Sequence, residues 1–245
     1  IGVAPGCGLA LLNVLVFPMH PSVLIPPVLA CGLSFGLCRA MVALGPKLGL
    51  MDQPDERRVH LSPVPRAGGI AVWLAFVALA YLVPLGNGLL GGGRWGNVQL
   101  LHSFVCASAV LVAVGVADDR RELKPWWKLL GQVVAAVCFF SLQRHGHGIL
   151  LGWHVPVWVD MAFFVAWAVL LVNAYNLIDG LDGLCGGLAL ISIVCLAVMA
   201  GVTGRVHETI LLATMGGALV AFLYFNRHPA RLFLGDAGSM MLGLT

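Results

Sequence analysis

Charged residues are scarce in this sequence. Only 10% of its 245 residues are Asp, Glu, Lys or Arg, and 60% are hydrophobic, whereas a soluble domain carries about 25% charged residues. One soluble core could not bury so much apolar surface, so lipid must be the solvent for most of the chain. The formal net charge of +3 is small and is concentrated in loops, which argues against a nucleic-acid partner.

Three further patterns are missing. The seven cysteines lack metal-ligand spacing, which favours small apolar residues in helices over zinc sites or disulfides. No apolar stretch near the start has the basic and small-residue flanks of a cleavable signal. The alternating pattern of a membrane barrel is also absent. Because the lipid-exposed backbone must satisfy its own hydrogen bonds, the sequence predicts an all-α, polytopic integral membrane protein.

Apolar runs close to the roughly 17–25 residues of a membrane-spanning helix predict the spans. The chain begins with Ile1 and stops within an apolar segment at Thr245. We therefore expect a single transmembrane domain, residues 1–245, truncated at its C-terminal end, with about eight helices visible. The predicted spans are 22–45, 69–86, 100–117, 128–144, 157–176, 185–203 and 209–226, with an eighth starting near 237.

Basic residues gather on one side of these spans. Alternate connections share a side, so the loops at about 46–68, 118–127, 177–184 and 227–236 face the same way. That side holds ten basic residues: Lys47, Arg57, Arg58, Arg66, Arg120, Arg121, Lys124, Lys128, Arg227 and Arg231. The other side holds three: Arg94, Arg144 and Arg205. The positive-inside rule therefore predicts that the first four loops are cytoplasmic.

Acidic residues follow the same bias, although they hardly influence topology. Nine of the eleven lie on the predicted cytoplasmic side, and the exceptions are Asp160 and Glu208. Short loops between packed helices bring such groups close together. This face is therefore expected to carry chemistry that needs both carboxylates and cations.

The first two cytoplasmic segments combine phosphate-binding and acidic side chains. Residues 52–69 are rich in Pro and Gly, and Arg57, Arg58, His60 and Arg66 could surround a phosphate. The alternative is ordinary positive-inside charge beside anionic headgroups. Asp118 and Asp119 directly follow an apolar helix and are costly there unless solvated, paired or coordinating. A structural ion-pair cluster is the alternative for that pair.

The last two segments carry further carboxylates at helix ends. Asn176, Asp179 and Asp182 are spaced i, i+3, i+6, so a continuing helix would place them along one side. Asp236 precedes another apolar helix, where the helix dipole could stabilise it. Its functional interpretation is a hard oxygen ligand for Mg²⁺.

Together these four elements resemble a known family. The patterns D-x-P-x-x-R-x-x-H-x-x-P-x-P-R-x-G-G, D-D-R with a later K-L-L-G-Q, N-x-x-D-G-x-D-G-L and F-L-G-D-x-G-S are similar, in order and spacing, to those of the polyprenyl-phosphate N-acetylhexosamine-1-phosphate transferases, glycosyltransferase family 4. The first loop resembles the bacterial undecaprenyl-phosphate GlcNAc-1-phosphate transferases more than the phospho-MurNAc-pentapeptide transferases. Glu122 stands where the latter branch carries a lysine.

The resemblance implies a fold and a reaction. It implies a bundle of about ten or eleven helices in the bacterial cytoplasmic membrane, with a homodimer as one expected assembly. A sugar-1-phosphate, GlcNAc-1-phosphate by similarity, would pass from a UDP-sugar to undecaprenyl phosphate with release of UMP, as the first membrane step of cell-envelope polysaccharide synthesis. The family also has an H-x-H loop that lies beyond residue 245. The alternatives are transfer of phospho-MurNAc-pentapeptide or, in a different class, ion-coupled transport.

The resemblance also implies site roles. Asp236 would bind Mg²⁺, with Mn²⁺ as an alternative ion and Asn176 as a second ligand. Asp118 and Asp119 would be the catalytic pair. Substrate would be bound by Asn176, Asp179, Asp182, Lys128, Arg57, His60 and Arg66. The acceptor phosphate is largely ionised at neutral pH, since its second pKa is near 6. This favours direct in-line attack over a covalent aspartyl-phosphate intermediate.

Overall fold

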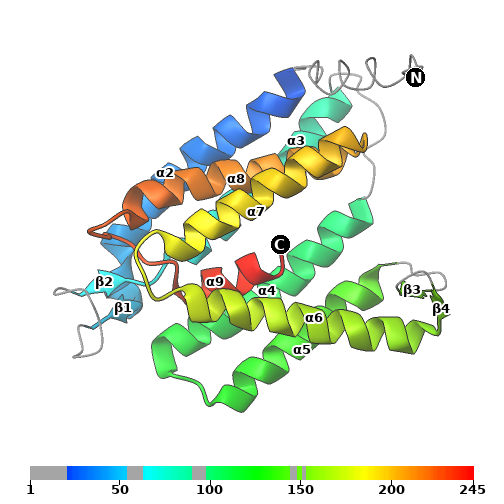
Figure 1. Cartoon of the computed structure of the whole chain (residues 1–245). Coiled ribbons are helices and arrows are strands. Elements are labelled where there is room, and N and C mark those ends of the chain that lie inside the picture. Colours follow the sequence, from blue (N-terminus) through cyan, green and yellow to red (C-terminus); the bar gives the residue numbers. More distant parts are fainter. Residues whose placement is uncertain (1–20, 54–62, 90–97, 144–147, 151–152) are drawn as a thin grey trace, which may run out of the picture.

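The chain folds as a bundle of apolar helices in a computed structural model that describes residues 21–53, 63–89, 98–143, 148–150 and 153–245 (Figure 1). Its helices are α2 (Pro21–Leu48), α3 (Gly68–Leu89), α4 (Val98–Arg121), α5 (Pro125–Leu142), α6 (Val157–Ile178), α7 (Leu184–Val202), α8 (Val206–Asn226) and α9 (Gly235–Gly243). Two antiparallel pairs of short strands join them: β1 (Met51–Asp52) with β2 (Val64–Pro65), and β3 (Gly148–Leu150) with β4 (Trp153–Val155).

Six of these helices are long and apolar enough to cross a membrane: α2, α4, α5, α6, α7 and α8. Large apolar side chains such as Leu177 and Val28 are exposed on their outer surfaces, as expected where lipid is the solvent. The prediction of an all-α, polytopic membrane protein is therefore confirmed. Each predicted apolar run corresponds to one helix, and the eighth is the nine-residue α9.

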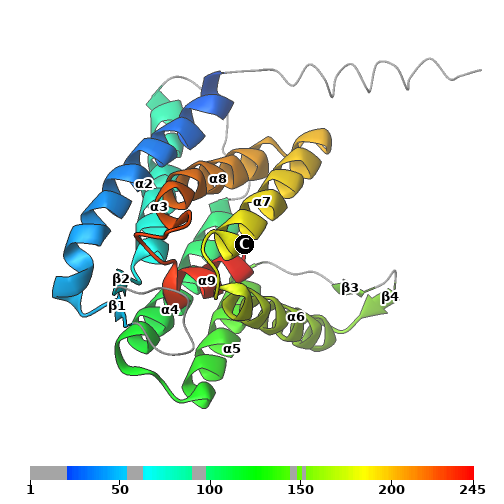
Figure 2. The ribbon, with the colours of Figure 1, turned by 60° about the vertical axis from the view of Figure 1, so that its left-hand side comes forward.

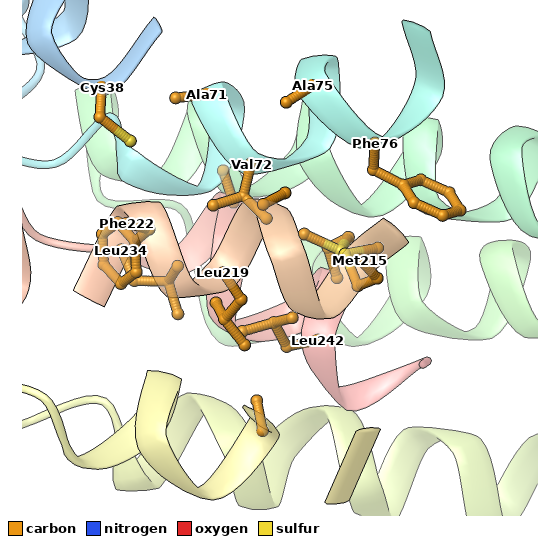
Figure 3. Close-up of a cluster of buried hydrophobic side chains, with 14 of the residues drawn as sticks. Cys38, Ala71, Val72, Ala75, Phe76, Met215, Leu219, Phe222, Leu234 and Leu242 are labelled. Carbon is orange, nitrogen blue, oxygen red and sulfur yellow. The ribbon is translucent and has the colours of Figure 1, made fainter. Parts of the chain in front are cut away.

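The main core lies where α2, α3, α8 and α9 meet. Val72 on α3, Leu219 and Phe222 on α8, and Leu234 next to α9 are all nearly or fully buried there (Figure 3). A smaller cluster joins α4, α5 and α6 to α9 through Met240. The short α9 is thus enclosed by both halves of the bundle, which fixes its first residues in place.

The two strand pairs lie at opposite ends of the bundle, which Figures 1 and 2 show from two sides. β1 and β2 lie near the start of α9, at the end where α4 and α5 are connected. This end carries most of the motifs described above.

One predicted loop is much shorter than expected. We predicted a loop at 118–127, but α4 continues to Arg121 and α5 already begins at Pro125. The Glu122 N–H donates to the Asp118 carbonyl at 2.8 Å, which closes the last helical turn. Proline suits the first turn of α5 because its missing N–H would have had no partner there. Asp118 and Asp119 are therefore helical residues at a helix end.

Candidate active site

Backbone hydrogen bonds tie the first of the four predicted cytoplasmic segments to the last one. The Gly68 and Gly69 N–H groups donate to the carbonyls of Phe233 and Leu234, both at 2.9 Å. The Phe233 N–H in turn donates to Pro65 O at 2.8 Å. Segments separated by about 165 residues in sequence are therefore held side by side, and the start of α9 is placed at this junction.

Gly235 allows α9 to start beside α4. Its φ of +73° lies in the left-handed region, which costs glycine little. A Cβ at this position would lie 2.7 Å from Asp119 Oδ2 and 3.0 Å from Arg66 O. A side chain here would therefore be strained and would also clash, so the glycine lets Asp236 approach the acidic pair.

Asp119 caps α9 from a different helix. Its side chain is 1% exposed and accepts hydrogen bonds from the Asp236 N–H at 3.2 Å and the Ala237 N–H at 3.4 Å. The first N–H groups of a helix have no partner within it, and they favour a carboxylate. Arg66 Nη1 lies 3.8 Å from Asp119 Oδ1. Asp119 is thus fully engaged in positioning the start of α9.

Lys128 lies between two carboxylates. Its Nζ is 3.0 Å from Asp118 Oδ2 and also donates to Asp236 Oδ2. Asp118 Oδ1 accepts the Leu123 N–H at 2.8 Å, which links it to the turn after α4. The ammonium group therefore balances charge from α4 and α9 at the same point.

Asp236 stays ionised in this environment. Burial raises the pKa of its carboxyl, but hydrogen bonds with Asp118 and Lys128, the charge of Lys128, and a hydrogen bond with Asn176 outweigh that effect, and the pKa lies below its ordinary value. Asn176 also donates to Ser239 Oγ at 3.0 Å. The predicted metal ligands Asp236 and Asn176 are therefore neighbours.

Asp179 behaves in the opposite way. It follows the last residue of α6, and burial together with the negative charges of Asp236 and Asp119 raises its pKa to about 7. Neutral and ionised forms of this carboxyl are therefore close in free energy near neutral pH. Carboxylates with such different pKa values, brought together where α6 ends and α9 begins, are typical of functional sites.

The expected alignment of Asp182 with Asn176 and Asp179 is wrong. α6 ends at Ile178, and Gly183 has a φ of +74°, so the helix does not continue. Asp182 Oδ2 instead contacts His228 Nδ1 at 2.9 Å and accepts the Ala230 N–H at 3.1 Å. The residue ties the α6–α7 loop to the α8–α9 loop, beside the cluster around Asp236.

The first loop is described in part. Arg57, Arg58 and His60 lie outside the described residues. Arg66 does reach the cluster, because its guanidinium contacts both Asp119 and Asp52, the latter at 2.6 Å.

Sequence reasoning assigned no role to a polar pair one helical turn below the cluster. Gln132 on α5 is 3% exposed, and its Oε1 accepts from Asn173 Nδ2 at 2.6 Å. Gln132 follows Lys128 by four residues, and Asn173 precedes Asn176 by three, so each pair shares a helix face. This spacing is the feature of the sequence from which a role for Gln132 and Asn173 in supporting the site could have been predicted. The pair joins α5 to α6 and thereby sets Lys128 opposite Asn176.

The donor set suits a hard divalent cation. Within the residues that the structure places, no group of three His, Cys, Asp or Glu side chains is arranged as a ready-made metal site. Mg²⁺ seldom needs one, because it is usually held by one or two carboxylates together with waters and substrate phosphates. Asp236 and Asn176 offer oxygen donors, and the carboxyl groups of Asp119 and Asp179 lie close enough to Asp236 to interact with its charge. These residues therefore fit Mg²⁺.

Comparison with known proteins places this arrangement in a class. Glycosyl transferase family 4 matches residues 101–245, more than half of the chain. The chain belongs to this family of membrane transferases.

Individual relatives agree with that assignment. The chain is 34% identical over 206 residues to a probable undecaprenyl-phosphate N-acetylglucosaminyl 1-phosphate transferase of Bacillus subtilis, covering 80% of this chain and 53% of that protein. It is 32% identical over 222 residues to a decaprenyl-phosphate N-acetylglucosaminephosphotransferase of Mycobacterium tuberculosis, covering 82% and 53%. A phospho-N-acetylmuramoyl-pentapeptide-transferase of Limosilactobacillus fermentum is 42% identical over 182 residues, covering 73% and 57%. The chain spans about half the length of the curated relatives it matches.

Proposed function

We propose that this protein transfers a sugar-1-phosphate, GlcNAc-1-phosphate in particular, from a UDP-sugar to a polyprenyl phosphate and releases UMP. The reaction would take place on the cytoplasmic face of a bacterial inner membrane and would depend on Mg²⁺ or Mn²⁺. It would begin the synthesis of a cell-envelope polysaccharide.

The observation that carries this proposal is the meeting of Asp118, Asp119, Asp179 and Asp236 with Lys128 and Arg66 at one end of an apolar bundle. A transporter would need such groups near the bilayer midplane, where substrates cross. A lipid acceptor and a water-soluble donor instead meet at the interface. Two N-acetylglucosamine-phosphate transferases among the relatives support this choice of reaction.

Phosphoryl transfer depends on positioning of the substrates and on charge neutralisation more than on covalent catalysis by the protein. Asp236 and Asn176 would hold the divalent cation, which when bound supplies charge stabilisation to the diphosphate. Lys128 and Arg66 would contact phosphate oxygens, since both cations already face the carboxylate cluster. Asp179 would line the nucleotide site.

We infer that Asp118 and Asp119 are positioning residues. Asp118 holds Lys128 and the turn at Leu123, and Asp119 holds the N-terminus of α9. A nucleophile would have to leave these partners to reach a sugar phosphate. The acceptor phosphate, with a second pKa near 6, is ionised without help at neutral pH. Both points support direct in-line attack by the acceptor.

The proposal is tested by UMP release from radiolabelled UDP-GlcNAc, using membranes from cells that express the gene encoding this chain. Release is expected to require added undecaprenyl phosphate and to stop when EDTA removes the divalent cation. Vector-only membranes are the control. Release that does not depend on the acceptor would contradict the transferase assignment.

The sugar needs its own comparison, because a pentapeptide transferase is among the relatives. UDP-GlcNAc and UDP-MurNAc-pentapeptide are offered at equal concentration. We expect the lipid product to carry GlcNAc. A lipid product that carries only MurNAc-pentapeptide would show that the donor is UDP-MurNAc-pentapeptide and not UDP-GlcNAc.

A further inference from the structure

An aromatic and arginine cluster lies where α2 and α8 pack together. Phe35 on α2 contacts Tyr224 and Phe225 on α8, with ring centroids 5.6 and 5.0 Å apart. Phe35 and Tyr224 remain 41% and 44% exposed. Figures 1 and 2 both show α2 and α8 crossing side by side. The rings therefore form an apolar surface patch on the outside of the bundle.

Two guanidinium groups stack on these aromatic rings. The Cζ of Arg227 lies 4.9 Å from the Tyr224 ring centroid, and that of Arg231 lies 5.1 Å from the same centroid. Arg231 is also 5.3 Å from the Phe225 centroid. Arg39 follows Phe35 by four residues and so shares its face of α2. We call Arg39, Arg227, Arg231 and Tyr224 the arginine ledge.

These cations have no carboxylate partner among the residues that the structure describes. In the part of the chain that the structure describes, no carboxylate forms an ion pair with Arg39, Arg227 or Arg231. The neighbouring acid, Asp182, bonds to His228 and the Ala230 N–H instead. Two like charges over one ring repel each other, and a cation–π contact does not neutralise either of them. The arrangement favours an anion between the guanidinium groups.

The surroundings of the ledge are apolar and open. Val28, two turns before Phe35 on the same face of α2, is 68% exposed, and Val220, one turn before Tyr224, is 49% exposed. Between Val28 and Phe35 on α2, a Cβ built on Gly32 would meet nothing within 4 Å. Such a surface, apolar towards the bilayer and basic at one end, matches a molecule with acyl chains and an anionic head.

We propose that the arginine ledge binds the headgroup phosphate of an anionic glycerophospholipid, with the acyl chains along Val28 and Val220. Basic surfaces between transmembrane helices on the cytoplasmic side are suited to such headgroups. Guanidinium forks match phosphate oxygens better than ammonium groups do. A prenyl phosphate shares this chemistry. A bulk phospholipid is favoured because the cations that the structure places in contact with the carboxylate cluster are Lys128 and Arg66, and none of the three ledge arginines is among them.

The test measures lipid retention by the purified, detergent-solubilised protein, for example by native mass spectrometry. Phosphatidylglycerol, phosphatidylcholine with the same acyl chains, and undecaprenyl phosphate are compared. We expect the wild type to prefer phosphatidylglycerol over phosphatidylcholine. Arg227→Gln/Arg231→Gln should weaken phosphatidylglycerol binding about thirtyfold, at about 1 kcal/mol per arginine.

Arg121→Gln/Lys124→Gln is the matched control, because it removes two exposed cations from the same end of the bundle. It should leave phosphatidylglycerol binding close to the wild-type value. Arg39→Gln, on a separate helix, tests the ledge again if the double variant does not fold, and should weaken binding about fivefold.

Three results would overturn the proposal. The first is equal binding of both glycerophospholipids by the wild type. The second is an equal loss in the ledge and control variants, which would indicate general surface charge. The third is a preference for undecaprenyl phosphate that disappears with Arg227→Gln/Arg231→Gln, which would make the ledge an acceptor site. UMP release is not measured here, so the result stands apart from the proposed reaction.

Discussion

Substitution of Asp119 by Asn distinguishes a positioning role from a chemical one. The carboxylate accepts the N–H groups of Asp236 and Ala237 at 3.2 and 3.4 Å, both longer than the usual 2.9–3.0 Å. Each is therefore worth about 1 kcal/mol at most. Asparagine keeps one acceptor oxygen but presents an amide N–H to the other donor. The substitution also relieves the repulsion between Asp119 and Asp236.

If Asp119 has a positioning role, the substitution should raise the activation free energy by about 1–2 kcal/mol, which lowers the rate about 5- to 30-fold. A side chain that forms the covalent bond costs far more when it is removed, about 10⁶-fold in a well-studied protease. The two roles therefore differ by several orders of magnitude. Asp160→Asn, on the opposite side of the membrane by our topology, is the matched control and should retain wild-type activity.

The assay is the pH–rate profile of UMP release at saturating donor and acceptor, for Asp119→Asn and for Asp118→Asn. For a positioning role we expect a loss of about 5- to 30-fold in both variants, with the same dependence on pH as the wild type. A carboxylate that assists ionisation of the acceptor would instead matter most in acid, where the phosphate monoester is protonated. A collapse of more than about 10⁴-fold at every pH in both variants, with a trapped phospho-enzyme in the wild type, would refute direct attack.

Three further outcomes follow from the same site. Asp236→Asn should abolish activity at limiting Mg²⁺ while the protein stays folded, and near-normal turnover would remove Asp236 from the metal site. Asp179→Asn should raise the Tm at pH 8 but not at pH 4. The pKa of Asp179 is raised from 3.8 to about 7, so its protonated form stabilises the folded state fully below pH 3.8. This stabilisation is lost as the pH rises through 7, where the folded protein must hold a buried negative charge that asparagine lacks. A Tm gain of equal size at both pH values would contradict this assignment. Cysteines placed at Arg121 should resist a membrane-impermeant label in intact cells, whereas cysteines at Arg205 should react; the reverse pattern would invert the topology.

The sequence predicted the helices well because their signal is local. Apolar runs of spanning length can adopt few other structures in lipid, and each predicted run is a helix in the structure. Helix ends were less predictable. Nothing local indicated that α4 continues past Asp119, because that turn is stabilised by contacts with α5 and α9.

The sequence predicted which residues form the site, but it did not predict which hydrogen-bond donor each carboxylate contacts. The one-sided distribution of acids identified Asp118, Asp119, Asp179 and Asp236 as neighbours. Their division of labour depends on which donor each one meets, and those donors come from distant segments. Asp182 shows the limit: its spacing aligned it with Asn176, yet a turn at Gly183 directs it to His228 instead.

The position of α9 explains why buried carboxylates gather here without a matching number of cations. Asp119 and Asp236 meet because α9 begins inside the bundle, and its first N–H groups need an acceptor that α9 itself does not supply. Asp119 meets that need only by bringing a second negative charge next to Asp236. Lys128 and Arg66 offset part of this charge, but Arg66 is shared with Asp52. Burial, together with the charges of Asp236 and Asp119, raises the pKa of the nearby Asp179 to about 7. An anionic substrate would add further negative charge to this cluster, and this connects the capping of one short helix to the proposed need for a divalent cation.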